Sequence, residues 1–324
     1  MIVVVAPGQG SQTPGFLSPW LELDGVAEKL ADLSSHADLD LIEHGTVSDA
    51  DTIRDTRIAQ PLIVAAGLVT LDQLFSPADG ADGADGADDE DLPAAGGIAG
   101  HSVGEITAAA GAGVLTETDA IRLVAARGRA MADAAADIAT GMSAVIGGDE
   151  EAILTRLTEL GLSPANYNGG GQLVVAGELL ALEALAADPV PGTRVIPLQV
   201  AGAFHTDFMS PAVDAVRTVA AGMSPAAPRI DLWTNRDGSR VDDGSEFLDL
   251  LVGQISSPVR WDLTMEGFAA AGVTGIIELA PAGALTGLAR RALRGVPTVA
   301  VKTPADLPAA RALLTTTAQE GDRA

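Results

Sequence analysis

A serine between two glycines is the residue of this chain best suited to covalent chemistry. Gly100-His101-Ser102-Val103-Gly104 follows an apolar segment at 96–100 and precedes an Ala-rich segment that starts at Glu105. Glycines at this spacing permit a tight strand-to-helix turn, which exposes the serine at the N-terminus of a helix. The helix dipole and the free N–H of Val103 can then stabilise an oxyanion. The pattern favours a nucleophile elbow carrying Ser102 over a plain turn serine.

A serine nucleophile needs a base, and the chain contains four histidines. His36 and His44 lie in a polar segment and are expected at the surface, while His101 adjoins the serine and suits a supporting hydrogen bond. His205 remains, at the end of a predicted strand, and by elimination it is the general base. Asp207 is too close along the chain to orient the distal ring nitrogen of His205. We therefore favour a Ser-His dyad in which a backbone carbonyl can take the place of an aspartate.

Two further features lie near these residues in the predicted fold. Arg127 interrupts an apolar helical segment, and a buried guanidinium needs an anionic partner. That partner is either an internal carboxylate or a substrate carboxylate held bidentately. The turn Pro7-Gly8-Gln9-Gly10-Ser11-Gln12 follows the first strand, at the edge where open α/β sheets bind ligands. It is either an ordinary turn or a source of backbone N–H groups for an oxyanion hole.

The elements around these residues alternate between strands and helices. Strands are predicted at 2–6 and 96–100, and helices at 60–75, 103–113 and 117–135, which favours a mostly parallel sheet covered on both faces. Between 136 and 200, four short strands surround two helices, as in a split-βαβ, ferredoxin-like subdomain. The predicted fold class is α/β, with a large domain at 1–135 and 201–324 interrupted by this small one. Ala-Asp-Gly repeats at 76–91 predict a disordered surface loop.

The overall composition restricts the possible partners and compartment. A formal net charge of -25, with Lys29 and Lys302 as the only lysines, disfavours nucleic-acid and membrane partners. The absence of cysteine excludes a thiol nucleophile and a cysteine metal site. No apolar run is expected to approach the ~18 residues of a membrane span, so a cytoplasmic location is predicted. An acidic partner would need a local basic patch, which Arg290, Arg291 and Arg294 could supply from one predicted helix.

Six segments together resemble one family, the malonyl-CoA:acyl carrier protein malonyltransferases of type II fatty acid synthesis, which are kin of polyketide synthase acyltransferase domains. The resemblance covers nearly the whole chain and is more specific than the elbow alone. The segments are Pro7 to Gln12, Gly100 to Glu105, Arg127-Gly128 with Met131, Ala165-Asn166-Tyr167-Asn168 leading to Gln172, Gly202-Ala203-Phe204-His205, and Gln254 before Pro258-Val259-Arg260-Trp261.

The resemblance implies a role for each matching residue. Ser102 would attack the thioester of malonyl-CoA while His205 takes its proton, and the N–H groups of Gln9 and Val103 would hold the oxyanion. Arg127 would bind the free carboxylate of the malonyl group. The main-chain carbonyl of Gln254 would orient the histidine, and the substrate pocket would include His101, Met131 and Phe204.

The family also implies the reaction and the fold. The phosphopantetheine thiol of an acyl carrier protein would accept the malonyl group in a ping-pong mechanism, with no metal and no cofactor beyond the CoA thioester. The expected protein is a cytoplasmic monomer with a large hydrolase-like α/β core and an active site between core and insertion. Val103 and Phe204 favour malonyl over methylmalonyl, although Gly202 departs from the commoner His. A thioesterase or esterase, a methylmalonyl-selective acyltransferase and a non-catalytic docking module remain as alternatives.

Overall fold

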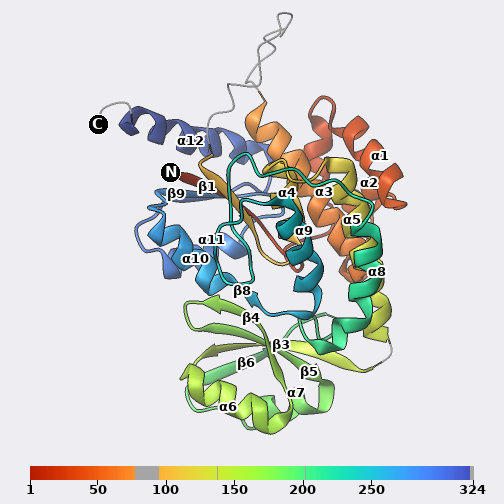
Figure 1. The fold of residues 1–324 in the computed structure, drawn as a ribbon, viewed down its shortest axis with the longest axis vertical. Helices are drawn as coiled ribbons and strands as arrows, with labels where there is room; N and C mark the ends of the chain where they lie inside the picture. The colour runs from red at the N-terminus through yellow and green to blue at the C-terminus, as the bar shows by residue number, and fades with distance from the viewer. Residues whose placement is uncertain (77–94, 137, 201, 322–324) are drawn as a thin grey trace, which may run out of the picture.

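A parallel sheet of five strands forms the centre of the larger lobe in the computed structural model, which describes residues 1–76, 95–136, 138–200 and 202–321 (Figure 1). The strand order is β10-β9-β1-β2-β7. The strands are β1 (Ile2–Ala6), β2 (Gly97–Gly100), β7 (Asp231–Leu232), β9 (Gly275–Glu278) and β10 (Thr298–Ala300). Most of the loop predicted at 76–91 lies outside the described residues.

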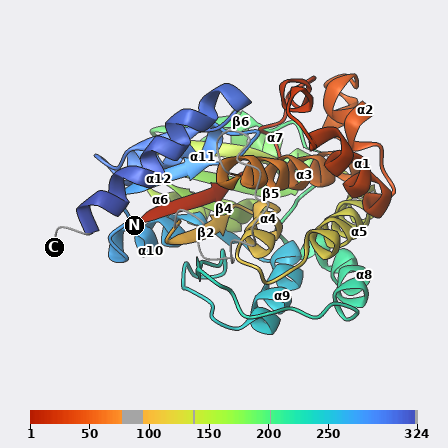
Figure 2. The ribbon, with the colours of Figure 1, turned by 90° about the horizontal axis from the view of Figure 1, so that it is seen from above.

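Helices cover both faces of this sheet because β1 is apolar on both sides. Ile2, Val4 and Ala6 face one core and Val3 and Val5 face the other, as the alternation of a strand requires. The first core contains α1 (Val26–Ala37), α2 (Leu41–Thr46), α3 (Thr56–Phe75), α4 (Gly104–Gly111), α5 (Glu117–Ala136), α8 (Ser210–Ala220), α9 (Gly244–Gly253) and α12 (Leu307–Gly321). The second contains α10 (Trp261–Ala270) and α11 (Ala284–Ala292). Figure 2 places α12 at the end of the molecule opposite α1 and α2.

The smaller lobe is an antiparallel sheet with two helices on its outer face. It consists of β3 (Thr140–Gly147), α6 (Glu150–Leu160), β4 (Ser163–Gly169), β5 (Gln172–Glu178), α7 (Leu179–Ala187) and β6 (Thr193–Pro197), with strand order β6-β3-β5-β4. This βαββαβ order is that of the ferredoxin-like fold. A fifth strand, β8 (Val259–Arg260), comes from outside 136–200 and pairs in parallel with β4. The sheet of the small lobe is thus continued by the large domain.

These elements confirm the predicted fold class, a large α/β domain with a mostly parallel sheet and an inserted ferredoxin-like unit. The expectation that no apolar run approaches the length of a membrane span was wrong. Within the described residues, Thr56–Phe75 is one helix of 20 residues that is long and apolar enough to cross a membrane, and 78% of its most apolar window is buried in the fold. Its apolar surface on all sides reflects its central position in the first core, where neighbouring helices surround it.

Candidate active site

The elbow stands at the carboxyl end of β2, directly beside the end of β1. Ala6 pairs with Gly100, so the two loops that follow these strands lie side by side. A Cβ on Gly100 would lie 2.0 Å from the carbonyl carbon of Gly104, and a Cβ on Gly104 would lie 2.2 Å from the carbonyl oxygen of Ala6. Only glycine fits at both positions. Ser102 has a φ of 54°, a left-handed conformation that costs ~1–3 kcal/mol and is typical of functional sites.

His205 faces the serine from a turn after β6. Its Nε2 lies 2.6 Å from Ser102 Oγ and its Nδ1 lies 2.9 Å from the carbonyl oxygen of Gln254. A carbonyl can only accept, so Nδ1 carries the proton and Nε2 presents a lone pair to the serine hydroxyl. Burial, with a smaller contribution from the charge of Arg127, lowers the pKa of His205 to about 3. The imidazole is therefore neutral at physiological pH, with the lone pair of Nε2 directed at the serine hydroxyl.

Two backbone donors border the serine. Gln9 and Val103 line the cleft in front of Ser102. Within the described part of the chain, the N–H groups of these two residues donate no hydrogen bond. Val103 precedes the first residue of α4, where unpaired N–H groups and the helix dipole favour a negative charge. This pair of N–H groups has the chemistry of an oxyanion hole.

Arg127 lies behind the serine on α5 and is only 2% exposed. Its Nη1 donates to Gln60 Oε1 at 2.7 Å, and its Nη2 donates to Gln254 Oε1 at 3.0 Å. Nη2 also lies 3.5 Å from Ser102 Oγ. Burial lowers the pKa of Arg127 to about 10, which still leaves it charged at neutral pH. Among the described residues no carboxylate forms an ion pair with it, so its direct partners are neutral.

Three polar residues that sequence reasoning missed support these groups. Gln60 on α3 accepts from Arg127, and Asn235 bridges the elbow by accepting from the N–H of Ser102 at 2.8 Å and donating to the carbonyl of Gly100 at 2.8 Å. Glu105, on the first turn of α4, is 1% exposed and accepts from the backbone N–H of Asn235. Like Arg127, Gln60 is a polar side chain in an apolar helical segment, and this pattern could have identified it. No comparable feature of the sequence points to Asn235.

The other predicted pocket residues surround a cleft of about 940 Å³ between the two lobes. His101 Nε2 lies 2.9 Å from Asn168 Oδ1 on β4, and its ring meets Trp261 edge-on at 5.5 Å. Burial lowers the pKa of His101. Phe204 and Met131 are buried and line the cleft. The floor is the inner face of the small sheet, which includes Met142, Ala144, Asn166, Asn168, Gln172 and Val174.

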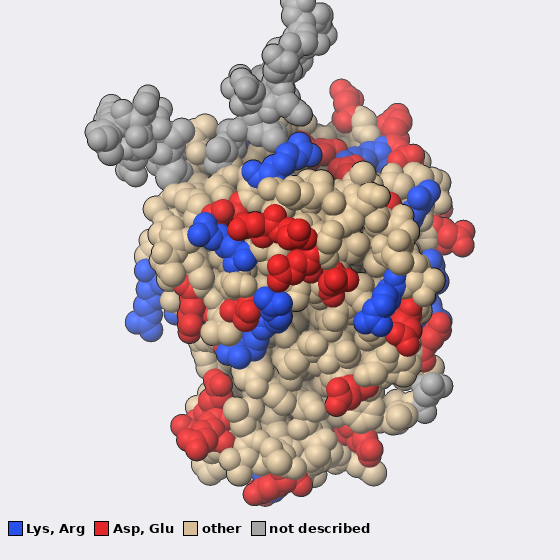
Figure 3. All heavy atoms as spheres, in the orientation of Figure 1, with Lys and Arg blue, Asp and Glu red and all other residues tan. Residues whose placement is uncertain are grey.

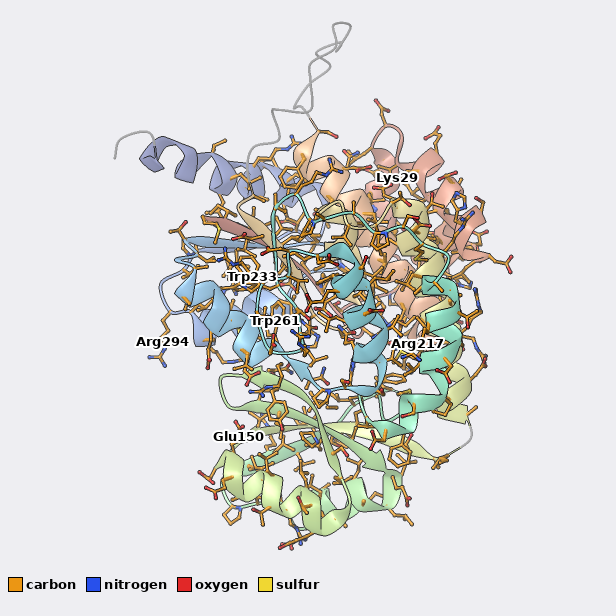
Figure 4. All side chains as sticks on the ribbon, viewed as in Figure 1. Lys29, Glu150, Arg217, Trp233, Trp261 and Arg294 are labelled. Atoms are coloured by element: carbon orange, nitrogen blue, oxygen red, sulfur yellow. The ribbon has the colours of Figure 1, made fainter. Side chains whose placement is uncertain are left out.

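The remaining predicted residues lie away from Ser102 or at the rim. His36 and His44 are half-buried on α1 and α2, and His44 Nδ1 contacts Ser48 Oγ at 2.9 Å. Arg291 lines the cleft, and Arg290 donates to Thr298 at 3.0 Å. Figure 4 shows Arg294 projecting away from the body of the protein, and Trp261 near the junction of the lobes. Arg290 and Arg291 lie in the last turn of α11, whereas Arg294 follows the end of this helix and is not on it as predicted.

Comparison with known proteins identifies the family. Residues 3–319 match the acyl transferase domain model. The malonyl CoA-acyl carrier protein transacylase of Mycobacterium tuberculosis strain H37Rv is 51% identical, covering 95% of this chain and 98% of the relative. The Escherichia coli K12 protein of the same name is 33% identical, covering 94% and 97%.

Solved structures agree with the sequence relatives. The crystal structure of the Mycobacterium tuberculosis protein has a TM-score of 0.89 at 50% identity and covers 96% of this chain and 99% of that one. A malonyl-transacylase solved in complex with a holo type II polyketide acyl carrier protein has a TM-score of 0.84 at 30% identity, with 95% and 98% covered. This chain belongs to the acyl transferase family, among the malonyl CoA-acyl carrier protein transacylases.

Proposed function

We propose that this protein transfers the malonyl group of malonyl-CoA to the phosphopantetheine thiol of an acyl carrier protein through a malonyl ester of Ser102. The environment of Arg127 is the main support for this function. Its buried guanidinium has neutral amide partners, and its Nη2 lies 3.5 Å from Ser102 Oγ. An acyl group on this serine that ends in a carboxylate would bring the missing anion to the buried cation.

In the first half-reaction, His205 Nε2 takes the proton of Ser102 Oγ as Oγ attacks the thioester carbonyl carbon. The negative charge that develops on the carbonyl oxygen is stabilised by the N–H groups of Gln9 and Val103. Collapse of the tetrahedral intermediate breaks the C–S bond, and the proton on His205 passes to the departing CoA sulfur. The carbonyl of Gln254 stabilises the transient imidazolium because it accepts from Nδ1–H at 2.9 Å.

In the second half-reaction the same groups act in reverse. The phosphopantetheine thiol loses its proton to His205 and its sulfur attacks the ester carbonyl of malonyl-Ser102. The Ser102 Oγ leaves and recovers the proton from His205, which restores the free enzyme. The chemistry proposed here uses these side chains and backbone groups alone, with no cofactor besides the thioester substrate. We place the enzyme in the cytoplasm as a monomer that serves fatty acid or polyketide carrier proteins.

Malonyl is favoured over methylmalonyl because Phe204 and Met131 occupy the pocket wall. Both side chains are buried and line the cleft beside Ser102. A methyl branch on the acyl chain adds volume that a packed wall accommodates poorly. A thioesterase would use the same serine and histidine with water as acceptor, and a buried arginine offers no advantage to a general hydrolase. Arg127 therefore discriminates between the two functions.

Intact-protein mass spectrometry after mixing with malonyl-CoA tests the proposal. We expect the protein to gain the mass of one malonyl group, with peptide mapping that locates it on Ser102. Ser102→Ala should gain nothing, and His205→Asn should gain it far more slowly. A wild-type protein that releases no CoA and forms no adduct would favour a non-catalytic docking module. Turnover of malonyl-CoA that is unchanged in Arg127→Ala would favour a hydrolase.

The carrier protein is expected to dock on the exposed arginines of the α11 end. The chain has a net charge of -25, and on the face that Figure 3 shows, basic side chains are interspersed with acidic ones. An acidic carrier protein therefore needs a local cationic site near the mouth of the cleft. Arg291 lies at that mouth, with Arg290 and Arg294 nearby on the same segment.

A further inference from the structure

One buried carboxylate next to the site has no part in the reaction as described above. Glu105 follows Ser102 by three positions, at the start of α4, and is 1% exposed. A buried carboxylate is costly unless its oxygens are hydrogen-bonded or its charge is compensated. Glu105 meets the first condition through groups that belong to the active site.

Both oxygens of Glu105 act as acceptors. Oε1 accepts from the backbone N–H of Asn235 at 2.7 Å, and Oε2 accepts from Nε2 of Gln254. The backbone donor fixes the role of the first oxygen, since an N–H can only donate. The second oxygen accepts from the NH₂ end of the Gln254 carboxamide, so this end faces Glu105.

The orientation of this carboxamide determines which of its two ends faces Arg127. Its Nε2 lies among acceptors only: the Glu105 carboxylate, the carbonyl of Ser102 at 3.2 Å and Asn235 Oδ1 at 3.4 Å. Its Oε1 consequently points the other way and accepts from Arg127 Nη2 at 3.0 Å. A flipped amide would place an NH₂ group against the guanidinium and lose this bond.

We propose that Glu105 is a positioning residue for substrate selection: through the side chain of Gln254 it fixes the orientation of Arg127 towards the acyl group on Ser102. Burial raises the pKa of Glu105 to about 8 and lowers the pKa of Arg127 to about 10, and the attraction between the two groups opposes both shifts.

The same geometry separates this role from the serine and its base. The main-chain carbonyl of Gln254, which accepts from His205, is held by the short 3₁₀ helix Gln254–Ser256, where the N–H of Ser257 also donates to it at 3.2 Å. The side chain and the main chain of Gln254 thus serve different groups. Loss of the acceptor at Oε2, with the hydrogen bond from Asn235 to Oε1 kept, should disturb Arg127 and leave the serine-histidine pair nearly intact.

The substitution Glu105→Gln tests the inference because it keeps the shape and removes one acceptor. A glutamine at this position satisfies either the N–H of Asn235 or the NH₂ of Gln254, and not both. We expect kcat/KM for Ser102 acylation by malonyl-CoA to fall about 10- to 100-fold, the equivalent of one charge-assisted hydrogen bond. Acylation by p-nitrophenyl acetate, which has no carboxylate for Arg127, should change by less than about threefold.

A matched control is Glu278→Gln. Glu278 is also fully buried, and its oxygens accept from the backbone N–H groups of Leu285 at 2.9 Å and Thr286 at 2.8 Å. It makes no contact with Arg127 among the interactions of the described residues. This variant should lose stability and retain the preference for malonyl-CoA over p-nitrophenyl acetate.

A double-mutant cycle provides the second readout. In an Arg127→Met background, Glu105→Gln should reduce malonyl acylation by less than about threefold further, since both changes act through the same group. If Glu105→Gln does not fold, Glu105→Asp keeps the carboxylate with a shorter reach, and its loss should again be confined to malonyl-CoA.

Equal losses with both acyl donors, or additive losses in the cycle, would overturn the inference and make Glu105 a purely structural residue. The inference rests on the proposed function, so wild-type malonylation of Ser102 is measured first. If wild type fails to form the adduct, the proposed function fails. If wild type forms it and Glu105→Gln keeps its malonyl preference, only the role of Glu105 fails.

Discussion

Replacing Arg127 with methionine should remove the preference for malonyl that we propose for this site. Methionine fills a similar volume without charge or donors. In the structure the guanidinium makes hydrogen bonds of 2.7 Å and 3.0 Å to the side chains of Gln60 and Gln254, with Nη2 3.5 Å from Ser102 Oγ. A malonyl carboxylate in front of Nη2 would replace no existing ion pair, so its whole interaction with Arg127 counts towards binding and catalysis.

The size of the effect follows from that geometry. Charge-assisted hydrogen bonds contribute ~1.5–3 kcal/mol each, so two to a carboxylate correspond to a loss of ~10²- to 10⁴-fold in kcat/KM for malonyl-CoA. Acetyl-CoA lacks the carboxylate, so kcat/KM for acetyl-CoA should not fall through loss of these hydrogen bonds. The oxygens of Gln60 and Gln254 also lose their donors, which lowers the free energy of unfolding by ~1–3 kcal/mol each.

Acylation of Ser102 by malonyl-CoA and acetyl-CoA, followed as CoA release under single-turnover conditions, measures the effect. Thermal unfolding of the variant first establishes the temperature at which it is folded. The ratio of kcat/KM values should shift towards acetyl-CoA by at least ~10²-fold. Equal losses for the two donors would refute the assignment of Arg127 to the acyl carboxylate.

Three further predictions concern the base, the elbow and the partner. Burial, and to a smaller extent the charge of Arg127, lowers the pKa of His205 from 6.5 to about 3. Below pH 6.5 the unfolded chain therefore binds a proton at His205 that the folded protein does not bind. Stability should therefore fall as pH drops below 6.5, by about 2 kcal/mol at pH 5, and urea unfolding should show a smaller fall in His205→Gln. Asn235→Ala leaves the N–H of Ser102 and the carbonyl of Gly100 without their partner and should lower the free energy of unfolding by ~2–4 kcal/mol in urea, whereas a change below ~0.5 kcal/mol would contradict its role. Reversing Arg290 and Arg294, which do not line the cleft, to Glu should raise the KM for carrier protein about tenfold and leave malonyl-CoA acylation unchanged, and an unaltered KM would place docking elsewhere.

Local sequence was sufficient to predict the elbow and the fold class. A side chain at Gly100 or Gly104 would collide with backbone atoms of the elbow or of the end of β1, so both positions require glycine. The spacing of these glycines in the sequence therefore predicts the elbow. The ferredoxin-like unit was equally visible, because its strands and helices are consecutive in the chain. The added strand Val259–Arg260 was not, since it joins that sheet from a distant segment.

The first helices were missed even though their signal was present. Val26, Leu30, Leu33 and Ala37 are buried on α1 at helical spacing. The polar residues around His36 and His44 instead led to the prediction of a surface segment.

The polar network around Arg127 depends on contacts that sequence reasoning could not reach. Asn235 lies 133 positions from the serine whose N–H it accepts, and Gln254 lies 149 positions from Glu105. Only the folded chain brings these residues together. Glu105 was quoted as part of a motif, but its role depends on which amide end of a distant glutamine it faces.

Transfer from an isolated acyl-enzyme to a carrier protein distinguishes a malonyltransferase from a hydrolase. The malonyl adduct is prepared, freed of CoA and mixed with holo acyl carrier protein, and both proteins are followed by mass spectrometry. We expect the malonyl mass to leave Ser102 and to appear on the phosphopantetheine arm much faster than it is lost to water. Release of free malonate at the same rate with and without carrier protein would contradict it and identify a hydrolase.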